Sequence, residues 1–169
     1  MKPLLPPDNH HLAAVEGWLG LGNPAEAAQE LEQISPAARQ HPEVLGASYQ
    51  VSAATRNWES ATVSARAICE TIPESPFGWI HLAYALHELK RTREAYEVLI
   101  PVLETFPDDY VMRYNLACYS CQLGDLAEAR RWLRQAVPLA GPNEIKRMAA
   151  DDLDLQPLWP ELDQLAGTS

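Results

Sequence analysis

Four short stretches recur along the chain and decide its fold: Asn23-Pro24-Ala25-Glu26-Ala27, Asn57-Trp58-Glu59-Ser60-Ala61, Arg91-Thr92-Arg93-Glu94-Ala95 and Asp125-Leu126-Ala127-Glu128-Ala129. Each stretch starts with a polar turn and ends at an alanine, and successive alanines stand 34 residues apart. A period of this length is typical of stacked helical hairpins. Such stacks usually work by binding other molecules, so the period predicts the architecture and the mode of action but does not name a partner.

Prolines close the later repeats. Pro73 and Pro107 are again 34 residues apart, and Gly141-Pro142 takes this place in the fourth repeat. Proline cannot continue a helix, and the residue before it is pushed out of helical geometry. Each unit therefore reads as a helix, a tight turn, a second helix and a stop. The predicted units span residues 8–41, 42–75, 76–109 and 110–143. In the first unit, Ser35-Pro36 is expected to end the second helix early.

The third unit carries the fullest internal pattern, made by Trp79, Leu82, Ala83, Leu86, Ala95, Leu99, Val102 and Pro107. It resembles the tetratricopeptide repeat (TPR), in which tryptophan, leucine, a small residue, alanine, large apolar residues and a closing proline follow in this order. The resemblance covers about residues 8–143. It implies an all-α fold, a right-handed α-solenoid of about four helix-turn-helix units like those of small bacterial TPR proteins. The uninterrupted period predicts one domain over residues 1–169.

An apolar stretch follows the fourth unit and is expected to form a C-terminal cap over residues 143–165. Asn143 can cap a helix that runs through about residue 152. The remainder is interpreted as a short wrap that closes the end of the stack. The alternative is that part of it reaches into the groove of the stack as a built-in occupant. Asp151, Asp152 and Asp154 are expected to end a helix and to stay hydrated.

Composition limits the partners and the compartment. The net charge is −10, so nonspecific binding to nucleic acid or to an anionic membrane is disfavoured. The opening residues 1–7 contain no apolar run typical of a signal peptide, and no later stretch is apolar enough to span a bilayer. Three cysteines are an odd number, which argues against a disulfide framework. These features predict a soluble, cytoplasmic protein that binds neither nucleic acid nor membrane.

The TPR resemblance places function on the concave face, which the first helix of each unit lines. Large apolar and aromatic side chains on such a face suit a peptide or a helix of a partner protein. For Tyr84 and Tyr114 we expect a binding role, because their hydroxyls need water or a partner. For Ile80 and Val111, packing between helices is an equal alternative. The predicted peptide-binding groove consists of Gln50, Phe77, Ile80, Tyr84, His87, Val111, Tyr114, Cys118, Cys121 and Gln122.

A chemical hypothesis rests on Cys118 and Cys121, which form a CxxC motif. Residues three apart share a helix face, so both thiols can bind a soft metal, with His87 as a third ligand. Against this, the pair lies well inside its predicted helix, and no fourth ligand is evident. We expect two small core or groove residues instead. With no phosphate loop or nucleophile elbow, the sequence predicts no metal, no cofactor, no catalytic residue and no enzyme activity.

Two functions of different class fit the sequence. The first is a non-catalytic interaction module that binds a peptide or a helix of a partner protein in its concave groove. The second is a structural or chaperone subunit that self-assembles as a homo-oligomer or holds an unstable partner, as small secretion-system TPR chaperones do. A carboxylate-clamp co-chaperone is excluded, because Leu12, Glu16, Ala47, Phe77 and His81 stand at the clamp positions and supply no lysine or arginine.

Overall fold

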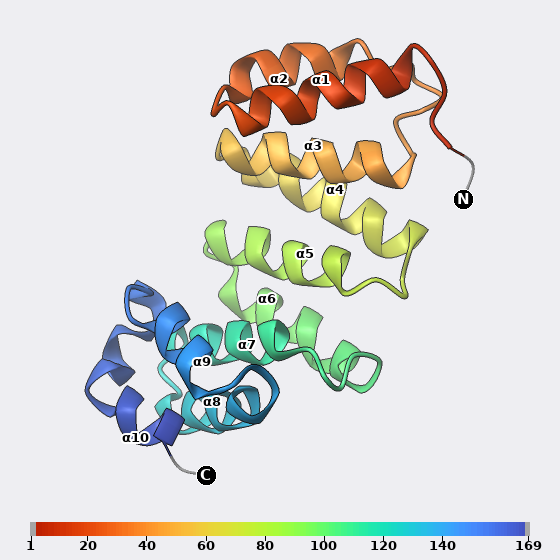
Figure 1. Cartoon of the computed structure of the whole chain (residues 1–169). Coiled ribbons are helices and arrows are strands. Elements are labelled where there is room, and N and C mark those ends of the chain that lie inside the picture. The colour runs from red at the N-terminus through yellow and green to blue at the C-terminus, as the bar shows by residue number, and fades with distance from the viewer. Residues whose placement is uncertain (1–2, 168–169) are drawn as a thin grey trace. The chain divides into compact units, whose positions relative to one another are not determined.

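The computed structural model describes residues 3–167 and, within that range, every side chain except those of residues 165 and 166. Met1, Lys2, Thr168 and Ser169 of the predicted domain therefore lie outside the described residues. The regular structure of the described range is entirely helical (Figure 1). In chain order its elements are α1 (Asp8–Gly20), α2 (Pro24–Glu32), α3 (Pro42–Ala54), α4 (Trp58–Thr71), α5 (Pro76–Glu88), α6 (Thr92–Leu99), the 3₁₀ helix η1 (Ile100–Glu104), α7 (Tyr110–Gln122), α8 (Leu126–Ala140), α9 (Pro142–Ala149), the 3₁₀ helix η2 (Leu153–Glu161) and α10 (Leu162–Gly167).

The described residues fall into two compact units, which divide between Ala85 and Leu86 inside α5. In the first unit α1 packs on α2 and α3, and α3 packs on α4. Part of its core is a cluster of buried apolar side chains: Leu12, Val15, Ala27, Ile34, Ala38, Val44, Ala47 and Val51.

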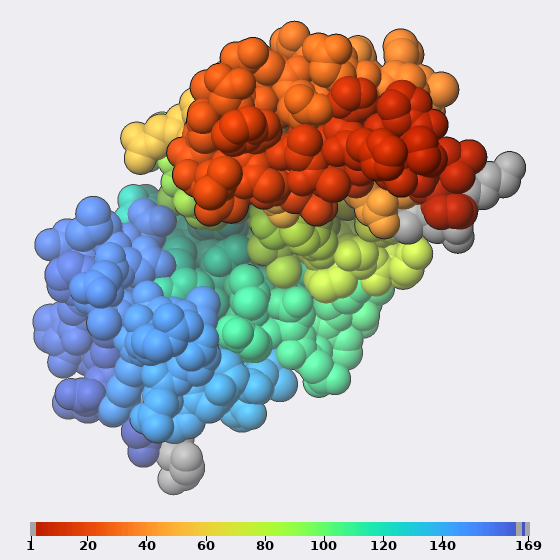
Figure 2. Space-filling view, turned by 45° about the horizontal axis from the view of Figure 1, so that its top comes forward, coloured from red at the N-terminus to blue at the C-terminus, as the bar shows by residue number. Residues whose placement is uncertain are grey.

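In the second unit α7 packs on α6, α8 and η2, while α9 and α10 pack on α8 and on each other. Its fully buried side chains include Leu99, Met112, Leu116, Leu133, Ile145, Leu155 and Leu158. In the space-filling view, the blue C-terminal residues of this unit lie together in one continuous area (Figure 2).

The tight turn inside each repeat has the same backbone in all four copies. One residue per turn has a positive φ, and these residues are again 34 apart: Gly22 (71°), Arg56 (56°), Lys90 (63°) and Gly124 (83°). The next amide donates to the carbonyl five residues back, at 2.8 to 2.9 Å: Asn23 to Trp18, Asn57 to Ser52, Arg91 to Leu86 and Asp125 to Ser120. This is the Schellman ending of a helix. The turn is thus set by local hydrogen bonds.

The residue after the positive-φ position starts the second helix. Asn23, Asn57 and Asp125 each accept a hydrogen bond from the backbone N–H three residues on, which satisfies one of the free donors of the helix start. Arg91 holds this place in the third repeat without a side-chain cap. An asparagine or aspartate side chain, placed once every 34 residues or a multiple of 34, therefore caps the start of the second helix in three of the four repeats.

The four ladder alanines, at positions 27, 61, 95 and 129, are completely buried. Ala83 and Ala117, which stand twelve residues before the last two, are also completely buried. The complete burial of these alanines agrees with the close helix crossings that the period predicts. The prediction of an all-α fold built from helix-turn-helix units is confirmed.

Two helix ends test the finer expectations. The second helix of the first repeat, α2, ends at Glu32, as Ser35-Pro36 predicts. The cap predicted at Asn143 is wrong: Gly141, with a φ of 89°, ends α8 and is also the N-cap of α9. Asn143 already lies in the first turn of α9, which stops at Ala149.

Among the described residues, no helix combines the length and the apolar composition needed to cross a bilayer.

Candidate functional site

On α5, in the first unit, Phe77 belongs to a small aromatic cluster. Its ring stacks on His81 at 3.9 Å between centroids, and Tyr49 of α3 meets His81 edge-on at 4.6 Å. Burial lowers the pKa of His81. Phe77 itself is half-buried, so it both supports the cluster and presents part of its ring to solvent.

Tyr84 is the most open aromatic side chain of the predicted groove, with 43% of its surface exposed. It packs edge-on against Trp58 of α4, with 5.6 Å between ring centroids. Ile80 is half-buried one turn before it, and Gln50 on α3 is exposed. The first unit therefore presents several of its predicted groove residues to solvent.

In the second unit the predicted groove is covered. His87, Tyr114, Cys118 and Cys121 are 4 to 6% exposed, Val111 is half-buried, and Gln122 alone of this group is exposed. The cover is the chain itself, because η2 packs against α7. We call residues 152–161 the C-terminal segment. In this unit the C-terminal segment therefore lies against the helix face on which the sequence predicted a partner.

Asp152 anchors the beginning of the C-terminal segment. Its Oδ2 accepts hydrogen bonds from the Tyr114 hydroxyl at 2.7 Å and from the Cys118 thiol at 3.4 Å. Its Oδ1 accepts from the N–H of Asp154 at 3.0 Å and so caps η2. Burial raises the pKa of both Tyr114 and Cys118, so both keep their protons and act as donors.

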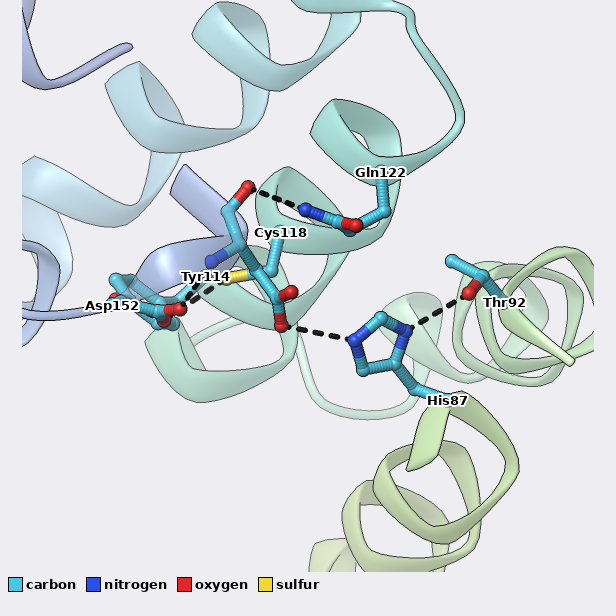
Figure 3. A network of polar contacts seen from close by, with 7 residues as sticks. His87, Thr92, Tyr114, Cys118, Gln122 and Asp152 are labelled. Carbon is cyan, nitrogen blue, oxygen red and sulfur yellow. Dashed lines mark hydrogen bonds and ion pairs between the residues drawn. The ribbon is translucent and has the colours of Figure 1, made fainter. Parts of the chain in front are cut away.

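Asp154 makes the second anchor, through bonds to His87 and Gln122, which are labelled in Figure 3. Its Oδ2 lies 2.9 Å from Nε2 of His87, and its backbone carbonyl accepts from the Gln122 side-chain amide at 3.2 Å. Nδ1 of His87 lies 3.0 Å from the Thr92 hydroxyl. Because an ionised carboxylate only accepts, Nε2 carries a proton. Asp152 and Asp154 are half-buried, and beyond the hydration expected from the sequence their carboxylates bond to protein donors.

Apolar side chains and surface ion pairs complete the contact. Leu155 and Leu158 of the C-terminal segment are fully buried. At the far end, Glu161 accepts two hydrogen bonds of 2.7 Å from Arg130 of α8. Lys146 of α9 pairs with Asp163 at 3.0 Å. The segment is thus fixed in chain order by carboxylates, by leucines and by the Glu161–Arg130 ion pair, and the Lys146–Asp163 pair lies just beyond its end.

The two cysteines of the CxxC motif are small buried side chains. Burial raises the pKa of Cys121 to about 11, and Cys118 donates to Asp152. His87 is bonded to Asp154 and Thr92. In the part of the chain that the structure describes, no group of three or more histidine, cysteine or acidic side chains is arranged to hold a metal ion.

Sequence reasoning missed the two residues that organise this site, Asp152 and Asp154. The available signal was their position: both carboxylates come just before the leucines that the apolar pattern assigned to the cap. Two acidic residues next to a buried apolar pair need donors nearby, and Tyr114 and His87 were candidates for that role.

Comparison with known proteins places the fold. No family model matches the chain, and no curated protein matches it by sequence. Solved structures do match: residues 41 to the end of MamA from Desulfovibrio magneticus RS-1 align with a TM-score of 0.73 at 16% identity, over 96% of this chain and 97% of that one. TTC0263, a thermophilic TPR protein of Thermus thermophilus, aligns with a TM-score of 0.66 at 18% identity, over 95% and 97% of the chains.

PilF of Pseudomonas aeruginosa aligns with a TM-score of 0.67 at 17% identity, over 96% of this chain and 78% of its own. These likenesses, together with the repeated turns and buried alanines, define the class: the chain has the fold of a tetratricopeptide-repeat protein. Because the sequence identities to these structures are only 16 to 18%, the likeness shows the fold alone, and the function depends on the residues of the site.

Proposed function

We propose that this protein is a non-catalytic interaction module that binds a short segment of a partner protein against the faces of its first helices. One observation carries the proposal. The face of α7, a first helix, holds a short segment of the chain itself through Tyr114, Cys118 and Gln122, which are three of the predicted groove positions. A face that receives one short segment has the shape and the donors to receive another.

The face of α5 in the first unit supports the same function. Tyr84 is exposed and Phe77 and Ile80 are half-buried. Aromatic side chains bury much area on binding and lose little entropy, so they are common anchors of interfaces. The acidic chain, with three free cysteines, fits a cytoplasmic protein whose partner is a protein rather than a nucleic acid or a membrane.

Photo-crosslinking from position 84 tests this function. Tyr84 is replaced by the photoreactive p-benzoyl-phenylalanine in the full chain, and the protein is irradiated in an extract of its native host. The matched control carries the same group at Val63, which is 70% exposed on the second helix α4. We expect position 84 to capture a defined segment of a partner and position 63 not to capture it.

The captured segment is then synthesised and titrated against the wild type and Tyr84→Ala. Truncation of a central aromatic anchor typically costs about 1 to 3 kcal/mol, so affinity is expected to fall about tenfold or more. Equal capture from positions 84 and 63, or an unchanged affinity, would contradict the proposal. Capture of a second copy of this chain would favour the self-assembling structural subunit instead.

A further inference from the structure

The contacts of the C-terminal segment follow a chemical order. Asp152 and Asp154 come first. The Asp152 carboxylate accepts hydrogen bonds from the Tyr114 hydroxyl and the Cys118 thiol, and the Asp154 carboxylate accepts one from Nε2 of His87. Two leucines at positions 155 and 158 follow, both fully buried. The sequence of contacts is therefore Asp-x-Asp-Leu-x-x-Leu.

The segment is held as a ligand is held, mainly by side chains. η2 is a 3₁₀ helix that contains Pro157 and Pro160, which have no N–H to donate. Gln122 of α7 donates a hydrogen bond to the main chain of the segment, at the Asp154 carbonyl. Its far end is tied through one bidentate ion pair between Glu161 and Arg130, whose side chains are 37% and 30% exposed.

The start of the segment is also accessible. Leu153 lies between the two anchoring aspartates, yet 70% of its surface is exposed. Ala150 and Asp151, which join α9 to the segment, are exposed as well. The segment therefore meets solvent at its start and is tied at its end by one partly exposed ion pair, which favours its displacement from α7.

The face beneath it is selective. Tyr114, Cys118 and His87 are at most 6% exposed under the segment. A purely apolar replacement would leave these donors buried and unpaired, which costs about 1 to 3 kcal/mol for each group. A replacement with two carboxylates at the same spacing restores every bond.

We propose that residues 152–161 are a built-in competitor for the α7 face, and that the partner segment that displaces them carries two carboxylates two residues apart, followed by leucine-like side chains at the first and fourth positions after the second carboxylate. This inference rests on the proposed function and adds the chemistry of the ligand. The resident segment therefore has the same chemistry as the proposed partner segment and competes with it for the α7 face.

The test uses the full chain and a fluorescent peptide with the sequence of residues 150–163. The peptide is titrated by fluorescence anisotropy against the wild type and against Asp152→Ala/Asp154→Ala, which weakens the resident segment and leaves the receiving face intact. The matched control is Asp108→Ala/Asp151→Ala, which removes the same charge at two exposed positions. We expect the first variant to bind the peptide at least about tenfold more tightly than the wild type and the control, because a tethered competitor has been weakened.

Two further measurements make the test decisive. A peptide with alanine at both aspartate positions should bind the released variant at least about tenfold more weakly. Hydrogen exchange should show faster exchange at positions 155 and 158 in that variant, with helicity retained. If exchange shows that the segment is still protected, Glu161→Ala is added to release its far end, and the titration is repeated on that form.

Equal peptide affinity of the wild type and of the released form would overturn the inference, as would the absence of peptide binding to the released form. These outcomes are distinct from failure of the proposed function. A partner segment captured at position 84 that binds the wild type and the released form equally would leave the interaction module standing and remove the competition.

Discussion

Two of the four repeat turns place a long side chain where the backbone favours glycine. Gly22 and Gly124 adopt the left-handed conformation freely, whereas Arg56 and Lys90 adopt it with φ values of 56° and 63°. For a residue with a Cβ this conformation costs about 1 to 2 kcal/mol. The period requires the conformation at all four sites, so two sites carry strain.

Lys90→Gly is therefore expected to stabilise the protein. The relief of strain exceeds the extra entropy that glycine loses on folding, about 0.5 to 1 kcal/mol, so we expect a net gain of about 0.5 kcal/mol in the free energy of unfolding. Urea denaturation measures it. The reverse change, Gly124→Ala, should lose about 1 kcal/mol or more; a Lys90→Gly variant that unfolds at lower urea would refute the strain.

The role of a residue is most predictable where its type has one reason to be present. The ladder alanines are predictable because only small side chains fit a close crossing, and all four are buried. The roles of Asp152 and Asp154 were not predictable in this way. An aspartate near a helix end is usually hydrated. Asp152, however, bonds to Tyr114, which is 38 residues away in sequence, and Asp154 bonds to His87, which is 67 residues away. A local pattern cannot reveal such partners.

At the scale of elements, the approach of α4 and α5 depends on one glycine. A Cβ added at Gly78 would lie 2.9 Å from the backbone nitrogen of Cys69, and 3.0 Å from both the Cys69 sulfur and the Ile68 Cγ2. The nearest atom belongs to a helix backbone, which cannot rotate away. Glycine is therefore required for these two helices to pack this closely.

Gly78→Ala is expected to destabilise the protein by about 1 to 3 kcal/mol, as overpacking of a tight contact does. The matched control is Gly46→Ala in α3, where an added Cβ meets nothing within 4 Å. That change should instead gain up to about 1 kcal/mol from the helix propensity of alanine. Thermal unfolding of both variants checks the pair, and similar shifts in Tm would contradict the predicted contact.

The elements also show where sequence reasoning stops. Helix starts and turns follow from local rules, because their caps and carbonyl bonds span three to five residues. The position of the C-terminal segment does not. Its leucines indicated a cap, but the choice between an end wrap and a groove occupant depends on donors presented by α7 and by the end of α5, which come together only in the folded chain.

At the scale of the whole molecule, one helix belongs to both compact units, because α5 runs from Pro76 to Glu88 across their boundary. The 34-residue period also continues through this point. We therefore predict that the chain unfolds as one domain. A helix that crosses the boundary loses part of its hydrogen bonding whenever either unit opens.

Hydrogen exchange measured across a urea series can follow the two units separately. We expect the same midpoint for segments of both units and for the circular dichroism signal of the whole chain. Two resolved midpoints would instead show two independently folding domains and would replace the single-domain prediction.

The short connection between α9 and the C-terminal segment has a quantitative consequence for any partner. Only Ala150 to Asp152 separate the end of α9 from the start of η2, so the resident segment is presented to α7 at a local concentration on the order of millimolar. A free partner present at micromolar levels must then bind about a thousand times more tightly than the resident segment to occupy half of the molecules. The linker thereby sets a concentration threshold below which the site stays closed.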